Sequence, residues 1–272
     1  MNPLVCFHIH NEISIEDAWQ ELEDLECQLL YSSEDPNGAK EIYGYKNPSM
    51  DLVNCPSVIN VTPASLDIDW HAQWAEHGLD FYDGLVHVDL SKFGFKKTST
   101  PVIVMEPGPG FGDLSHPTTR LMLRIMSDLV QGQHVLDIGS GSGILTFAAS
   151  VMGADSACGV DIDIQANEHA KKNAELNGMQ NKISFVLPEN YQPVQGDKAL
   201  SILMNMIWSE QVVAWESLPQ VHHIPGDRII SGILAEERDD YLAQTKKWGW
   251  TYRSELEEEG WLAFHFEQLY DS

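Results

Sequence analysis

The first 66 residues carry short apolar stretches in two different rhythms. From Ile15 to Leu25, apolar residues recur every three or four positions, a spacing that predicts a helix. Ser14 stands where this helix would begin and Asp17 follows three residues later, a pair typical of a helix N-terminus. Strand-like runs surround the helix at residues 4–9, 27–31, 41–45 and 58–61. One helix among short strands predicts a small α+β unit.

Beyond residue 100, apolar runs and amphipathic stretches alternate. Strands are predicted at residues 134–138, 157–162, 183–187, 199–204, 228–234, 251–256 and 261–267. Helices are predicted at residues 119–129, 144–152, 164–177, 210–218 and 236–248. This alternation predicts a mostly parallel sheet with helices on both faces. Only a short turn separates the last two strands, so they should form an antiparallel hairpin at the sheet edge. Its acidic residues, Glu257, Glu258 and Glu259, are expected to be solvated.

The two rhythms predict a small domain at residues 1–68, a connector at 69–98 and a larger domain at 99–272. The connector contains Trp70 and Trp74, whose helical spacing favours packing between the domains over substrate stacking.

The chain has 16 Lys+Arg and 41 Asp+Glu residues, which give a formal charge of −25. Such a deficit argues against direct nucleic-acid binding and against anionic membranes, and it favours a cationic partner. No apolar stretch approaches the roughly 18 residues of a membrane span, and no signal peptide is visible at the start. The cysteines are widely spaced without a CxxC pair, so neither a zinc site nor a disulfide framework is predicted. A cytoplasmic protein is expected.

A glycine-rich turn follows the predicted strand at 134–138. Asp137 precedes Gly139, Gly141 and Gly143, and such glycines allow the backbone to approach a ligand closely. The helix start behind them offers free N–H groups to an anionic group. A dinucleotide fingerprint would need glycine where Ile144 stands, and a P-loop would need a lysine. The DxGxGxG spacing is that of S-adenosylmethionine-binding turns, with Asp137 near the positive charge of the cofactor.

Asp161 ends the next predicted strand, at the roughly 20-residue separation from Gly139 that is expected of an acid holding ribose hydroxyls. Its carboxylate would accept a hydrogen bond from each hydroxyl. The turn, the acid and the alternating elements together predict an S-adenosylmethionine-binding domain.

A second glycine-rich segment, EPGPGFGDLSHPTT at residues 106–119, precedes a helix start and is typical of a loop that closes over a ligand. At this point the chain resembles the ribosomal protein L11 methyltransferase family. The hallmarks of that family are a DPGxAFGTGxHPTT segment, a DxG(C/S)GSGIL turn, a DID strand end and an Asn-Ile-Leu after the fourth strand. This chain has DIGSGSGIL, DID and Asn205-Met206-Ile207 at the corresponding places, and the resemblance runs from Asp69 to about residue 268.

The resemblance implies a Rossmann-like class I methyltransferase with a seven-stranded sheet, whose cofactor contacts would include Thr119, Gly139, Asp161 and Asn205. It implies transfer of methyl groups to amino groups, on lysine side chains or the α-amine, of ribosomal protein L11. An acidic enzyme suits such a basic protein substrate. Asn205 would be catalytic, since it could orient the incoming nitrogen as well as the cofactor.

Alternatives remain open. The family has Thr-Gly where this chain has Asp113-Leu114, a departure that motivates a cofactor-binding protein without catalysis. The compact N-terminal region leaves open a related lysine methyltransferase with another protein target. A non-enzymatic interaction module would leave the glycine turn and Asp161 unexplained.

The remaining polar positions have plain interpretations, and no metal site is predicted. His8 and His10 alternate on a predicted strand, but without a third ligand nearby a surface or core role is favoured. Asp161 and Asp163 could suggest a magnesium site, but one side chain of such a pair usually points away. His116 is equally suited to a general base and to a loop residue before the helix.

Overall fold

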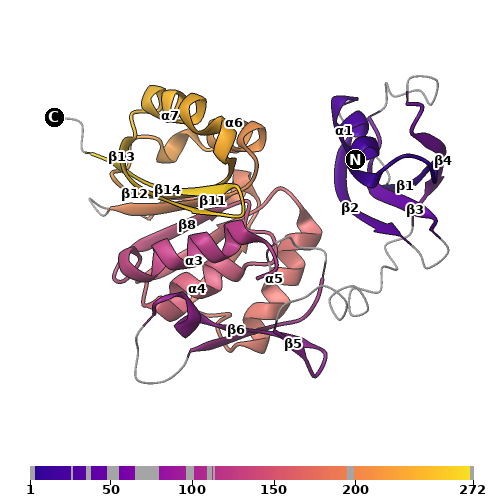
Figure 1. The fold of residues 1–272 in the computed structure, drawn as a ribbon. Helices are drawn as coiled ribbons and strands as arrows, with labels where there is room; N and C mark the ends of the chain where they lie inside the picture. Colours follow the sequence, from indigo (N-terminus) through magenta and orange to yellow (C-terminus); the bar gives the residue numbers. More distant parts are fainter. Residues whose placement is uncertain are drawn as a thin grey trace. The chain divides into compact units, whose positions relative to one another are not determined.

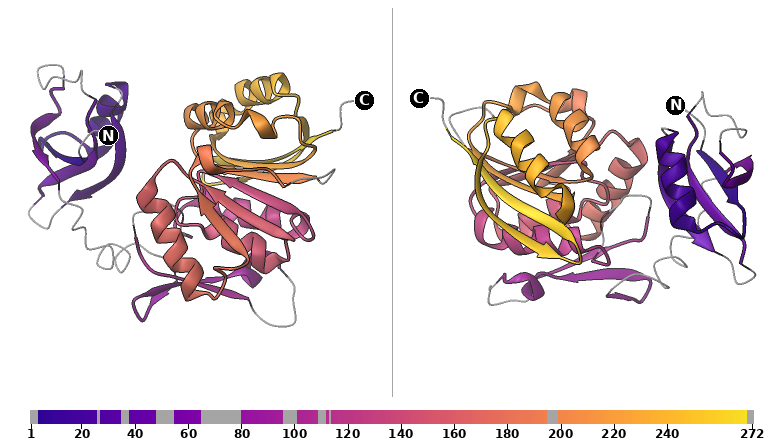
Figure 2. Two further views of the ribbon diagram at one scale, coloured as in Figure 1. Left: turned by 180° about the vertical axis from the view of Figure 1, so that it is seen from behind. Right: turned by 45° about the horizontal axis from the view of Figure 1, so that its top comes forward.

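The computed structural model describes residues 4–25, 27–34, 38–47, 55–64, 80–95, 101–108, 112, 114–194 and 199–269 (Figures 1 and 2). The chain divides into two compact units, Met1–Asp69 and Trp70–Ser272. The predictions made for Trp70, Trp74 and Asp113 lie outside the described residues, as does the part of the expected connector before residue 80.

The first unit contains the predicted helix as α1 (Ile15–Asp24). Ser14 caps it, because its hydroxyl accepts a hydrogen bond from the backbone N–H of Asp17 at 3.0 Å. Four antiparallel strands form a sheet in the order β2-β3-β1-β4. Their bounds are Leu4–Ile9 for β1, Gln28–Glu34 for β2, Lys40–Tyr45 for β3 and Val58–Pro63 for β4. The predicted small α+β unit is confirmed (Figure 1).

Alternate residues of β1 pack against α1. Phe7 and Ile9 are buried in an apolar cluster with Ala18 and Leu22 of the helix. Successive side chains of a strand point to opposite faces, so the residues between them, such as His8, belong to the face of the sheet that α1 does not cover.

The second unit is built on a seven-stranded sheet in the order β10-β9-β8-β11-β12-β14-β13. The bounds are His134–Ile138 for β8, Ser156–Val160 for β9, Ile183–Val186 for β10, Leu200–Asn205 for β11, Gly226–Leu234 for β12, Thr251–Glu258 for β13 and Trp261–Gln268 for β14. Strands β8 to β12 pair in parallel, and β14 lies antiparallel between β12 and β13. The predicted Rossmann-like sheet with an antiparallel edge hairpin is confirmed.

Helices cover both faces of this sheet (Figure 2). Their bounds are Pro117–Leu129 for α3, Ile144–Met152 for α4, Ile164–Leu176 for α5, Trp208–Glu216 for α6 and Arg238–Lys247 for α7. Short 3₁₀ turns lie at Leu90–Phe93, Pro188–Asn190, Pro219–Val221 and Ala235–Glu237. Neighbouring strand residues enter opposite cores: Val135 joins the cluster that contains α3, α4 and α5, whereas Leu136 joins the cluster that contains Trp215 and Tyr241 of α6 and α7.

The described part of the expected connector contributes strands that the sequence pattern did not predict. Strands β5 (Phe81–Tyr82) and β6 (Leu85–Asp89) form a second sheet with β7 (Val102–Met105), an unpredicted strand at the start of the expected larger domain. The apolar residues of these strands enter the core of the second unit. The side chain of Asn177 completes the edge: its Oδ1 accepts from Val104 N at 2.9 Å and its Nδ2 donates to Val104 O at 2.6 Å. Within the described ranges, no helix is long and apolar enough to cross a bilayer.

Candidate functional site

The strand order reverses between β8 and β11, which lie side by side (Figure 1). From β8 the sheet continues through β9 to β10 on one side and through β11 to β12 on the other. In open parallel sheets, ligands bind outside the carboxyl ends of the strands at such a reversal. Gly139, Asp161 and Asn205 stand at the carboxyl ends of β8, β9 and β11, so the structure brings these predicted residues to one edge.

The glycine turn adopts a conformation that side chains rarely permit. Gly139, Gly141 and Gly143 have φ angles of 71°, 50° and 85°. The N–H groups of Gly139 and Ser140 donate to the carbonyl of Val160 at 2.7 and 3.2 Å. The turn is therefore fastened to the end of β9, beside Asp161.

Gly143 is also required by its surroundings. It immediately precedes α4, and a Cβ atom at this position would lie 2.7 Å from the ring of Phe185 and 2.9 Å from that of Phe147. Both rings are buried. The structure thus gives Gly143 a packing role at the start of α4, and its contact with a cofactor stays a prediction.

The carboxylate of Asp161 links β9 to the turn. Its Oδ2 accepts from Gly141 N at 2.8 Å and its Oδ1 accepts from Asp163 N at 2.9 Å. Burial raises the pKa of Asp161, and these backbone donors oppose the rise. The side chain is only partly buried, which leaves it accessible at the sheet edge where the ribose role was predicted.

Asp137 lies beneath the turn. It is 1% exposed, and its Oδ2 accepts a hydrogen bond from Thr146 Oγ1 of α4 at 2.7 Å. Burial raises the pKa of Asp137 to about 7. The carboxylate therefore links β8 to α4, and its predicted contact with the positive charge of the cofactor stays a prediction.

Thr119 and Asn205, two of the cofactor contacts that the resemblance implied, lie next to each other, and their contact with a cofactor stays a prediction. Asn205 Nδ2 lies 3.5 Å from Oγ1 of Thr119, a fully buried residue in the first turn of α3. Asn205 itself is partly exposed at the end of β11. The side-chain amide of Asn205 therefore contacts the buried Thr119 on one side and remains accessible on the other.

Two residues that the site predictions omitted hold the segment at 205–206. The buried Gln211 of α6 donates its Nε2 to Met206 O at 2.7 Å and to Ser231 O at 3.0 Å. Gly232 has a φ of 92°, and a Cβ atom there would lie 2.1 Å from Met206 O. The sequence carried no signal for Gln211, because its burial and both of its carbonyl partners are known only from the fold.

The loop before α3 is anchored to the turn and to α5. Ser142 Oγ donates to Gly112 O at 2.7 Å, and His169 Nε2 lies 2.7 Å from Glu106 O. Leu114, part of the departure from the family pattern, is 2% exposed and belongs to the apolar core. The branched side chain at this position is therefore accommodated by burial.

His116 is a helix cap. It precedes α3, and its Nδ1 accepts from Thr118 N at 3.4 Å. Its ring packs edge-on against Trp261, with centroids 5.1 Å apart. These contacts favour the structural interpretation of His116 over the general-base interpretation.

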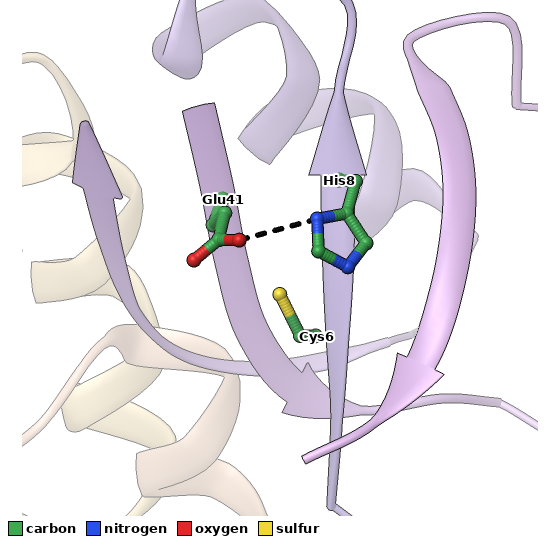
Figure 3. Close-up of side chains that lie close together, drawn as sticks. All are labelled: Cys6, His8 and Glu41. Carbon is green, nitrogen blue, oxygen red and sulfur yellow. Dashed lines mark ion pairs between the residues drawn. The ribbon is translucent and has the colours of Figure 1, made fainter. Parts of the chain in front are cut away.

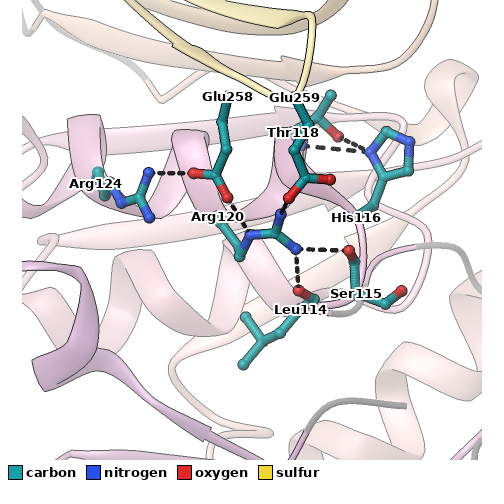
Figure 4. A network of polar contacts seen from close by, with 8 residues as sticks. All are labelled: Leu114, Ser115, His116, Thr118, Arg120, Arg124, Glu258 and Glu259. Atoms are coloured by element: carbon teal, nitrogen blue, oxygen red, sulfur yellow. Dashed lines mark hydrogen bonds and ion pairs between the residues drawn. The ribbon is translucent and has the colours of Figure 1, made fainter. Parts of the chain in front are cut away.

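Arg120 of α3 ties the loop to the edge hairpin (Figure 4). Its Nη1 donates to Leu114 O at 2.8 Å and Ser115 O at 2.6 Å. Its Nε and Nη2 donate to Glu258 at 2.6 Å and Glu259 at 2.8 Å. Partial burial would raise the pKa of Glu258, but the hydrogen bonds from Arg120 and Arg124 lower it. The expectation of a merely solvated acidic turn is wrong for Glu258, because two arginines bind its carboxylate.

The paired aspartates serve the backbone. Asp163 caps α5, since its Oδ1 accepts from Gln165 N at 2.8 Å, and the carboxylate of Asp161 accepts from Gly141 N and Asp163 N.

In the first unit, however, His8 lies close to Cys6 and Glu41, whereas His10 is exposed and stands apart from this group.

A sequence model of the ribosomal protein L11 methyltransferase (PrmA) family matches residues 39–268. The chain belongs to this family. The ribosomal protein L11 methyltransferase of Shewanella halifaxensis (strain HAW-EB4) is 35% identical over 186 residues, which cover 67% of this chain and 62% of that protein. The Chromobacterium violaceum protein of the same name is 41% identical over 145 residues, which cover 53% of this chain and 47% of that protein. The chain thus spans less than two thirds of the length of these relatives.

The family assignment agrees with the fold. The crystal structure of a ribosomal protein L11 methylase from Lactobacillus delbrueckii subsp. bulgaricus superposes with a TM-score of 0.55 at 23% identity. The match covers 67% of this chain and 98% of that chain. The DIGSGSGIL, DID and Asn205-Met206-Ile207 motifs noted in the sequence lie at the sheet edge that holds Gly139, Asp161 and Asn205.

Proposed function

We propose that the chain is an S-adenosylmethionine-dependent methyltransferase that acts on amino groups, lysine side chains or the α-amine, of ribosomal protein L11. The observation that carries this proposal is the meeting of the glycine turn, Asp161 and Asn205 where the strand order reverses. Relatives that are 35% and 41% identical bear the name of this activity.

The residues at this edge fit the cofactor. Gly139 and Gly141 present backbone without side chains, and Ser140 Oγ is buried with no hydrogen-bond partner among the described residues. Each oxygen of Asp161 accepts one N–H and has capacity for a further hydrogen bond, as a ribose diol requires. The cofactor supplies an electrophilic methyl group on a positively charged sulfur. The turn and Asp161 would fix its position relative to Asn205.

The acceptor amine must be neutral to attack that methyl group. With a pKa near 10.4, a lysine is only about 0.04% neutral at pH 7. Removal from water and a neighbouring positive charge both favour the neutral amine. With Nδ2 of Asn205 directed to Thr119, its Oδ1 would accept an N–H from the amine and aim the nitrogen lone pair at the methyl group. Positioning then supplies most of the catalysis, and no covalent intermediate is needed.

The overall charge suits a basic protein substrate. A formal charge of −25 attracts a cationic ribosomal protein, and the attraction fades with salt over a Debye length of about 8 Å. An enzyme that methylates a ribosomal protein would act in the cytoplasm. We propose no direct contact of the chain with nucleic acid or membrane.

The test is transfer of label from radioactive S-adenosylmethionine to purified ribosomal protein L11, followed by peptide mass spectrometry to locate the methyl groups. We expect labelled amino groups with the wild-type chain, at least tenfold slower transfer with Asn205→Ala, and unchanged transfer with the exposed control Asn181→Ala. Label on other ribosomal proteins but not on L11 would indicate a different target.

The alternative hypothesis is that the chain binds the cofactor but has no catalytic activity. It predicts measurable cofactor affinity and no methyl transfer to any protein. The burial of Leu114 in the core favours catalysis, because the altered loop remains anchored next to the turn. Calorimetric titration with S-adenosylmethionine beside the transfer assay separates the two cases.

A further inference from the structure

A second group of chemically active side chains lies in the first unit, on the sheet face that α1 does not cover. Cys6 and His8 of β1 and Glu41 of β3 point toward one another (Figure 3). The Cys6 sulfur, a ring nitrogen of His8 and a carboxylate oxygen of Glu41 all lie within 4.8 Å of one another. Among the described residues, Cys6, His8 and Glu41 are the three metal-ligating side chains that lie close enough together to bind one cation.

Strand pairing produces this group. Cys6 and His8 are two residues apart, so their side chains share a face. His8 stands directly opposite Glu41 in the antiparallel pairing of β1 with β3. The buried neighbours Phe7 and Ile42 point to the α1 side. The sheet therefore holds the three side chains at fixed positions.

Outer hydrogen bonds orient two of the three. His8 Nε2 lies 3.0 Å from Oγ1 of Thr62 on β4, which leaves Nδ1 facing Glu41. Tyr43 OH donates to Glu41 Oε2 at 2.6 Å, which leaves Oε1 facing His8. Nδ1 and Oε1 are 3.2 Å apart. Metal-binding histidines and carboxylates usually have such partners on their outer atoms.

We propose that Cys6, His8 and Glu41 form a binding site for one Zn²⁺ ion, with Thr62 and Tyr43 as orienting residues. Zinc prefers sulfur and nitrogen ligands, accepts a carboxylate and is tetrahedral, so these three side chains leave one position for water. A thiolate ligand disfavours Mg²⁺ and Ca²⁺, which take oxygen ligands.

The surroundings permit binding from solvent. The side chains of His8 and Glu41 are 34% and 30% exposed, whereas Cys6 is buried. Burial raises the pKa of the Cys6 thiol to about 11. Binding therefore releases the thiol proton to solvent as the sulfur–metal bond forms. The rival explanation is a metal-free hydrogen-bonded cluster, in which Glu41 pairs with His8 and the Cys6 thiol hydrogen-bonds to Tyr43 and Glu41.

The test uses the full chain, freed of metal by dialysis against a chelator and titrated with Co²⁺, because Co²⁺ bound to a thiolate gives a near-ultraviolet charge-transfer absorption. We expect this absorption to saturate at one equivalent and to disappear when Zn²⁺ is added. Cys6→Ser should abolish it, and Glu41→Gln and His8→Gln should weaken Co²⁺ binding at least tenfold. His10→Gln is the matched control and should bind as the wild type does.

The orienting residues give an independent readout. Thr62→Val and Tyr43→Phe keep all three ligands, and we expect each to weaken Zn²⁺ binding about 10- to 100-fold in a competition titration. Circular dichroism of each variant checks the fold. Absence of the charge-transfer absorption in the folded wild type, or its retention in folded Cys6→Ser, overturns the proposal. S-adenosylmethionine affinity should be the same in Cys6→Ser and wild type, so the outcome is independent of the proposed methyl transfer.

Discussion

The two sides of the candidate methyltransferase site are held in different ways. The turn at 139–143 takes its hydrogen bonds from the strand that follows it in the sequence, through Val160 and Asp161. The opposite side, residues 114–116 and 205–206, depends on Arg120 and Gln211, whose contacts join separate elements. A local motif therefore specifies one side, and the assembled fold specifies the other.

This difference teaches where the site is vulnerable. Changes in the turn should affect cofactor affinity directly. Arg120, Gln211 and Gly232 lie outside the motif. Changes in these residues should lower the stability of the fold and, as a consequence, displace Thr119 and Asn205. The following variants test that separation.

The largest effect is expected for Gly232→Ala, a support of the distant kind. Alanine at a positive φ costs about 1–2 kcal/mol, and the collision with Met206 O adds a comparable overpacking cost. We expect the free energy of unfolding to fall by about 3 kcal/mol, measured by urea denaturation. Gly178→Ala is the control, because Gly178 has a φ of 64° with nothing within 4 Å of an added Cβ. Equal losses in the two variants would contradict the proposed contact between Gly232 and the 205–206 segment.

On the motif side, Asp161→Ala should weaken S-adenosylmethionine binding about 10- to 100-fold, since it loses roughly 1.5–3 kcal/mol of charge-assisted hydrogen bonding. Asp163→Ala is the matched control. It removes the cap of α5, which should cost about 1 kcal/mol of stability with little change in affinity. Calorimetry measures both. Unchanged affinity in folded Asp161→Ala would show that this carboxylate serves only the turn.

Arg120→Ala should have a smaller effect on stability, about 1–2 kcal/mol, because two carbonyls lose their donor, Glu259 loses its arginine and Glu258 keeps only Arg124. It should also slow methyl transfer, since the loop at 114–116 loses its anchor. Arg253→Ala breaks the more exposed pair with Glu267 and should cost less than about 1 kcal/mol. If transfer slows equally in both variants, the loop is not the element through which Arg120 acts.

The most gradual effect expected is a pH dependence of stability that arises from Asp137. Its folded-state pKa, raised from 3.8 to about 7, means that the folded protein holds this proton where the unfolded chain has lost it. Stability contributed by the protonated group is therefore present at low pH and lost as pH rises from about 4 to about 7. Relative to that of Asp137→Asn, the free energy of unfolding of the wild type should fall by up to about 1.4 kcal/mol per pH unit in that window. Parallel stability curves for the two proteins would contradict this burial effect.

The same contrast explains what the sequence could predict. The strand at 134–138, the glycine turn and the helix at 144–152 were predicted with the observed bounds, because capping, periodicity and glycine positions are contiguous in the chain. The role of Glu258 was missed because Arg120 lies 138 residues away. The neighbours of His8 were missed because they depend on the register between β1 and β3. The short β5 was missed because two residues give too little periodicity to detect.

The contact between Arg120 and the edge hairpin also bears on the order of events during synthesis. The loop at 114–116 and α3 are made early, but Glu258 follows Arg120 by 138 residues. At about 5–20 residues per second, the ribosome needs roughly 7–30 s to make that intervening chain. During this interval the sheet lacks β14, which pairs with β12, and Arg120 lacks both carboxylates. The nascent chain therefore completes the loop side of its site only after the hairpin has left the ribosome, whereas the turn at 139–143 has its partners as soon as β9 is made.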